Sequence, residues 1–121
     1  MTKATLERLA NCDDLQLWIN ETLVRAVELD ATETSYERGD SGLTVQFRRG
    51  TRVLETSGPD IRFQGDAIPR LKRMARMDPA TESSRLTGEF DVYVGDEEYG
   101  LRAESTTTDS GERMVVRFRK K

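Results

Sequence analysis

The spacing of apolar residues changes along this 121-residue chain. Between residues 15 and 27 they recur every three to four positions, as on one face of an α-helix. From 33 to 55 they alternate with polar residues, as in half-buried strands. A second helical stretch and a second alternating stretch follow. This order predicts one α+β domain over residues 1–121, with two main helices packed on a mainly antiparallel sheet of about six strands.

The two predicted helices cover residues 14–29 and 66–77. Asp13 and Gln16 form a capping-box pattern before the first helix. Trp18 is the largest side chain on the apolar face of that helix, so we expect it in the core. Asp66 is predicted to cap the second helix, with Pro69 in its first turn, where the missing N–H costs little.

The alternating stretches predict strands separated by Gly-rich turns. Ser57 to Asp60 contains Gly-Pro, which we expect to end the third strand. Short connections favour antiparallel neighbours. The six predicted strands are 33–38, 43–48, 52–55, 90–94, 99–104 and 114–119.

The composition excludes several kinds of site. The chain has no histidine and one cysteine, Cys12, so the commonest general base and metal ligand are missing and no internal disulfide can form. We therefore predict no catalytic residue, no metal site and no cofactor. The absence of a long apolar run argues against membrane insertion, and the absence of an apolar leader segment predicts a cytoplasmic protein.

Arginines alternate outward on the predicted strands. One interpretation is a basic face that docks an acidic partner or retains a phosphate contact. The other is a set of solvated arginines paired across strands with Glu104 and Glu55. The same two interpretations apply to the basic face of the second helix. The candidate contact residues are Arg48, Arg102 and Arg117, with Arg113 at their edge, and Arg119 also points outward.

The overall charge argues against a continuous surface that binds the phosphates of a nucleic acid. The formal net charge is −3, whereas such surfaces usually need a strong basic excess. The basic residues at the end of the chain are not interleaved with aromatic ones. We therefore interpret them as a solvated strand end.

Several motifs resemble the small accessory domain that precedes the motor domain in the secretion and pilus assembly ATPases (type II secretion, type IV pilus). The resemblance covers roughly residues 15–119 and implies the same order of helices and strands. It implies further that the chain stops where a motor domain would begin. The motifs are GLTVQFR at 42–48, RLKRMARMD at 70–78, RAES at 102–105 and GERMVVR at 111–117.

Other positions depart from this family. The family carries an arginine pair where this chain has Glu82 and Ser83, and another arginine where it has Glu89. Family arginines in this region help to surround nucleotide phosphate, so a carboxylate there implies repulsion in place of a bidentate contact. The chain also contains no G-x-x-x-x-G-K-[ST] phosphate loop, so we predict that it is not an ATPase.

The resemblance and the surface charge predict a non-catalytic protein-interaction or regulatory module. Its partner would be an assembly ATPase or another component of a secretion, pilus or motility system. The alternative is a sensor that binds a nucleotide or another phosphorylated small molecule on the arginine face.

Overall fold

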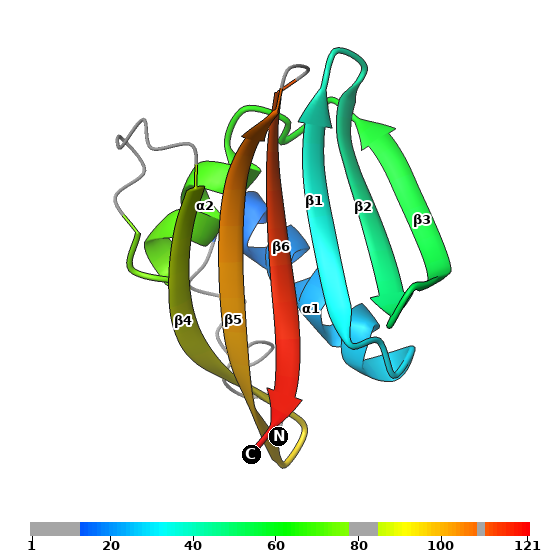
Figure 1. Cartoon of the computed structure of the whole chain (residues 1–121), viewed down its shortest axis with the longest axis vertical. Coiled ribbons are helices and arrows are strands. Elements are labelled where there is room, and N and C mark those ends of the chain that lie inside the picture. Colours follow the sequence, from blue (N-terminus) through cyan, green and yellow to red (C-terminus); the bar gives the residue numbers. More distant parts are fainter. Residues whose placement is uncertain (1–12, 78–84, 109–110) are drawn as a thin grey trace.

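The computed structural model describes residues 13–77, 85–108 and 111–121 (Figure 1). It confirms the α+β class. Cys12, Glu82 and Ser83 lie outside the described residues, so the predictions made for them are untested. The elements are α1 (Asp14–Glu28), β1 (Glu33–Gly39), β2 (Gly42–Arg49), β3 (Arg52–Asp60), α2 (Ala67–Met74), β4 (Arg85–Val94), β5 (Glu97–Thr108) and β6 (Gly111–Lys120).

The described strands form one sheet in the order β3-β2-β1-β6-β5-β4, and every neighbouring pair is antiparallel. β1 to β3 form one meander and β4 to β6 form another, and the two meanders join where β1 pairs with β6. Figure 1 shows α1 and α2 on the same side of this sheet. The described part of the chain therefore leaves the other side of the sheet, here called the open face, uncovered by helices.

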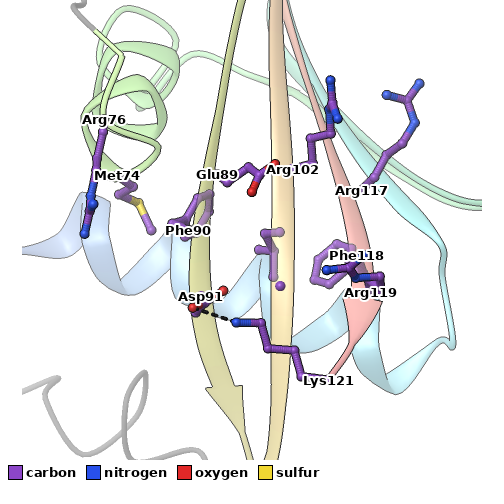
Figure 2. A pocket seen from close by; sticks show the side chains of 12 residues that line it. Met74, Arg76, Glu89, Phe90, Asp91, Arg102, Arg117, Phe118, Arg119 and Lys121 are labelled. Atoms are coloured by element: carbon purple, nitrogen blue, oxygen red, sulfur yellow. Dashed lines mark ion pairs between the residues drawn. The ribbon is translucent and has the colours of Figure 1, made fainter.

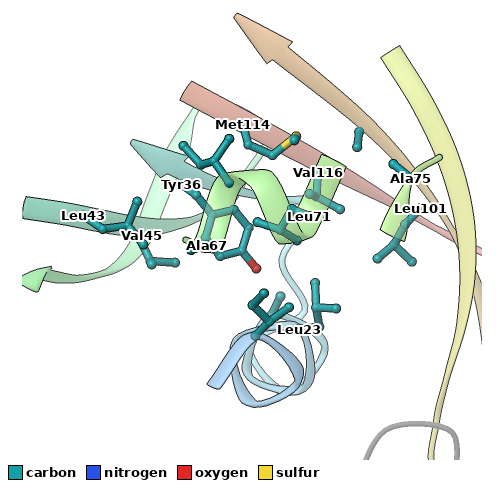
Figure 3. Packing of buried hydrophobic residues seen from close by; sticks show 14 of the residues in the cluster. Leu23, Tyr36, Leu43, Val45, Ala67, Leu71, Ala75, Leu101, Met114 and Val116 are labelled. Atoms are coloured by element: carbon teal, nitrogen blue, oxygen red, sulfur yellow. The ribbon is translucent and has the colours of Figure 1, made fainter. Parts of the chain in front are cut away.

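The core lies between the helices and the covered face of the sheet (Figure 3). Tyr36 is fully buried at its centre, and its hydroxyl lies 2.6 Å from Thr22 Oγ1. Burial raises the pKa of Tyr36. Trp18 is only half-buried, so its expected place in the core is wrong: it lies at the margin and packs its ring against Tyr36 and Phe63.

Both helices begin where predicted, but each forms only part of the predicted cap. At α1 the Asp13 side chain caps the helix, whereas the Gln16 amide bonds Asn20 and Arg70 instead of reaching back to Asp13. Asp13 Oδ1 accepts from the backbone N–H of Gln16 at 2.9 Å, and both oxygens of the carboxylate accept from Arg70. Asp66, by contrast, makes no side-chain capping bond. An N-cap side chain would accept from the N–H groups two or three residues on, and Pro69, three residues on, has none. The N–H groups of Asp66 and Ala67 donate to the carbonyl of Phe63.

α2 ends earlier than residue 77, with Arg76 in the left-handed region at φ 62°. The N–H of Met77 donates to the carbonyl of Lys72 at 2.7 Å, and that of Arg76 donates to Arg73 at 3.0 Å. This is the hydrogen-bond pattern of a Schellman termination, in which glycine usually occupies the position of Arg76.

β3 does not stop at residue 55, which corrects the prediction of a break at 57–60. It continues to Asp60 through shifts in its register with β2. β3 is an edge strand, where proline is tolerated because one side of the ladder is unpaired. Gly58 lies against β2 so closely that a Cβ there would come 2.6 Å from the Leu43 carbonyl oxygen.

Residues of the family-like motifs hold α2 to the sheet. The Lys72 ammonium forms a buried ion pair with Glu112 of β6, and Ser105 Oγ donates to the same carboxylate at 3.3 Å. Gly88 packs on the end of α2, where a Cβ would come 2.2 Å from the Ala75 carbonyl oxygen. The packing of α2 thus accounts for Lys72, Ser105 and Glu112 in these motifs without any ligand.

We expect the loss of either member of the Lys72–Glu112 pair to destabilise the protein strongly. The two side chains are 7% and 16% exposed, so Lys72→Met would leave a poorly solvated carboxylate, and the cost should be about 3–5 kcal/mol. The double variant with Glu112→Gln should recover part of the loss. Urea titrations of the single and double variants measure the coupling, and additive losses would contradict it.

The Asp13 carboxylate should titrate far below its ordinary range. The hydrogen bond from Arg70, followed by that from the Gln16 N–H, lowers the pKa of Asp13 from 3.8 to about 2. The ionised form therefore stabilises the fold above about pH 4, and this contribution is lost as the pH falls through 2. NMR titration of the Asp13 carboxyl tests this. Arg70→Gln should raise its pKa, and an unchanged value would contradict the assignment.

Candidate functional site

The candidate arginines lie on the open face, as their alternation predicted. Arg102 of β5 stands directly opposite Arg117 of β6, and Arg117 stands opposite Glu33 of β1. The same line continues to Arg48 of β2 and, in the other direction, to Glu89 of β4. Five neighbouring strands thus contribute one charged residue each, and together they are called the charged row: Glu89, Arg102, Arg117, Glu33 and Arg48.

The ion pairs expected between these arginines and two glutamates do not form. Glu104 pairs with Arg85, and Glu55 pairs with Arg25 of α1 at 2.7 Å. Arg117 Nε lies 3.8 Å from Glu33 Oε1, and the Arg117 side chain is 53% exposed. This is therefore a weak surface contact. Among the described residues, neither Arg102 nor Glu89 takes part in an ion pair. The centre of the charged row therefore keeps its charges available.

Arg113 lies apart from the charged row. It is on the same strand and face as Arg117 but pairs in register with Thr106 and Glu37. Its Nε is buried without a hydrogen-bond partner in the described part of the protein. On α2, Arg70 is held by Asp13 and Gln16, so it is a structural residue. The structure thus brings Arg102, Arg117 and Arg48 into one row and leaves Arg113 at the margin.

A hollow overlaps the charged row at β4, β5 and β6, and the end of α2 also lines it (Figure 2). Gly100 lies within it and contributes no side chain. The Lys121 ammonium reaches Asp91 at 2.9 Å, and this hydrogen bond raises the pKa of Lys121. The charged residues that line the hollow are Arg76, Glu89, Asp91, Arg102, Arg117, Arg119 and Lys121.

This arrangement suits recognition better than chemistry. The arginines can donate to carboxylates of a partner, and Glu89, directly opposite Arg102, would compete with a phosphate for that guanidinium. Within the described ranges, no group of three or more carboxylate, cysteine or histidine side chains is placed to hold a metal ion. Neither described helix has the length and apolar character needed to span a membrane.

Sequence reasoning found the arginines but not their acidic neighbours. Glu33 and Glu89 were part of the strand pattern, yet their places beside Arg117 and Arg102 depend on the register between strands distant in sequence. Lys121 belongs to the same alternation as Arg117 and Arg119. This alternation could have predicted that the basic surface extends along β6 to Lys121 at the hollow.

No protein-family model matches this chain. Similarity to curated proteins covers 100 residues, or 83% of the chain, and three relatives illustrate it. Over these 100 residues the chain is 29% identical to type II secretion system protein E of Pseudomonas aeruginosa and of Xanthomonas campestris pv. campestris. It is 25% identical to type II secretion system ATPase E of Vibrio cholerae. The chain is related to a part of the type II secretion E proteins.

The chain spans about a fifth of the length of these relatives, since the match covers 20%, 18% and 20% of them. A shared segment of this size is consistent with an accessory domain of the secretion ATPase. The relationship therefore supports a common fold for the matched segment, while the activity of the whole E protein is not carried over with it.

Arg76, which lines the hollow, occupies a backbone conformation better suited to glycine. We expect Arg76→Gly to stabilise the protein by about 1 kcal/mol, because glycine reaches positive φ without a Cβ clash. Asp30→Gly is the matched comparison at the end of α1, also at positive φ. Its gain should be smaller, since aspartate tolerates this region and Asp30 pairs with Arg49. Urea denaturation measures both, and a loss of stability in Arg76→Gly would contradict the reasoning.

Proposed function

We propose that this chain acts as a non-catalytic docking module that works with secretion, pilus or motility machinery. The candidate interaction surface is the open face, with Arg48, Arg102 and Arg117 in the charged row and Arg113 at its margin. The observation that carries the proposal is that Arg102 and Arg117 stand directly opposite each other on a face that the helices leave uncovered. Two adjacent guanidinium groups are best accommodated when carboxylates of a partner lie against them.

The absence of a phosphate-loop motif from the printed sequence supports a non-catalytic role. The kinship with type II secretion E proteins supports a partner from that machinery, such as an assembly ATPase. A single cysteine, which cannot form an internal disulfide, suits the reducing conditions of the cytoplasm. We do not propose the small-ligand sensor, because Glu89 stands directly opposite Arg102 and its carboxylate would compete with a phosphate for that guanidinium.

Arg102→Glu combined with Arg117→Glu should abolish partner binding without unfolding the domain. Both side chains are exposed, and reversal would replace attraction to partner carboxylates with repulsion. Wild-type binding should also weaken with salt, which screens exposed charges over about 8–10 Å. The measurement is affinity capture of partners from source cells, followed by binding of the purified partner at several salt concentrations.

The matched control is Arg38→Glu with Arg73→Glu, which changes net charge equally outside the charged row. The control should retain binding. Equal binding by both double variants would place the interface elsewhere. Sub-micromolar affinity for ATP, measured by calorimetry on the wild type, would favour a nucleotide sensor instead.

A further inference from the structure

The charges of the charged row follow a fixed order. From β4 to β2 they are negative, positive, positive, negative and positive. Neighbouring strands lie about 4.8 Å apart, so the five positions span about 19 Å. On β3 the row ends at Val53, an apolar residue that is 44% exposed. Figure 2 shows the first three members, Glu89, Arg102 and Arg117, side by side on their strands.

We propose that the charged row binds one α-helix of the partner protein, laid across the strands, with the complementary order of charges. Successive turns of this helix would present a base to Glu89, acids to Arg102 and Arg117, a base to Glu33 and an acid to Arg48. An apolar side chain would follow at Val53. The inference rests on the proposed function and specifies the partner segment that the open face accepts.

The spacing of the row selects a helix over an extended segment. A helix returns the same face to the sheet once per turn, or about every 5.4 Å, so four steps cover about 22 Å. An extended chain returns the same face about every 6.7 Å, so four steps cover about 27 Å. Long arginine, lysine and glutamate side chains can bend to bridge the difference of about 3 Å between four helical turns and the row. They cannot bridge the difference of about 8 Å that an extended chain would leave.

The neighbouring row on the open face offers no equivalent order of charges. Next to the charged row lie Thr87, Glu104, Val115, Ser35, Gln46 and Thr56. Glu104 is the one charged residue among them, and Arg85 already pairs with it. On the other side of the charged row lie Asp91, Gly100 and Arg119, of which Asp91 is engaged by Lys121 and Gly100 has no side chain. A helix displaced by one row would therefore lose most of its complementary contacts.

Two synthetic alanine-rich helices of about 20 residues test the order directly. The matched peptide carries Lys, Glu, Glu, Lys and Glu on successive turns, followed by leucine. The control carries Glu, Lys, Lys, Glu and Glu, which keeps the composition and net charge. Fluorescence anisotropy at low salt should show the matched peptide binding at least about tenfold more tightly, because each exposed charge pair contributes up to about fivefold.

A pair of charge reversals, one in the protein and one in the peptide, tests how the peptide is aligned along the charged row. Glu89→Lys should weaken the matched peptide about fivefold, and replacing the first lysine of the peptide with glutamate should restore binding to this variant. Glu21→Lys, on the exposed side of α1, makes the same change in net charge and should leave binding unaltered.

The outcomes separate this inference from the proposed function. Equal binding of both peptides, lost in Arg102→Glu with Arg117→Glu, would overturn the ordered row and retain the docking face. If neither peptide binds, while Arg102→Glu with Arg117→Glu still abolishes binding of the natural partner, the proposal that the row binds a helix is wrong and the docking face is retained. Partner binding unaffected by the double variant would overturn both proposals.

Discussion

The pairing of β6 with β1 is the contact on which the rest of this structure depends. It joins two meanders that are otherwise separate three-stranded units, and it fixes both faces of the sheet at once. On the covered face it places Tyr36 opposite Met114, at the centre of the core. On the open face it places Glu33 opposite Arg117. A slip of one residue would exchange the two faces, burying arginines and exposing the core, so the core enforces the register of the charged row.

The sequence predicted the elements well because their apolar periods are strong. Leu43, Val45 and Phe47 are buried, and Arg102 and Arg117 point away from the core, as alternation requires. Some errors lie where tertiary context overrides local pattern. Gly-Pro at 58–59 does not break β3, because an edge strand tolerates proline. Asp66 occupies the N-cap of α2 without a side-chain bond, because Pro69, three residues on, offers no N–H to accept from.

The candidate site was predictable in its residue types but not in its arrangement. Alternation alone identifies which arginines face outward. It does not reveal that Arg102 meets Arg117, or that Glu89 and Glu33 flank them, because these neighbours come from strands far apart in the chain. The expected partners Glu104 and Glu55 were instead engaged by Arg85 and by Arg25 of α1, contacts that only the packed structure defines.

The two faces of the sheet restrict their residues differently, and the family-like motifs reach both of them. Lys72 and Glu112 pair at the covered face, whereas Arg48, Arg102 and Arg117 lie on the open face. Lys72, Glu112, Ala75 and Gly88 belong to the contact between α2 and the covered face, where a buried ion pair and close backbone approach restrict the choice of residue. Glu89 lies on the open face, where solvent imposes no such restriction and a charge can change without loss of packing. The open face can therefore change the chemistry of its partner while the fold that positions it stays the same.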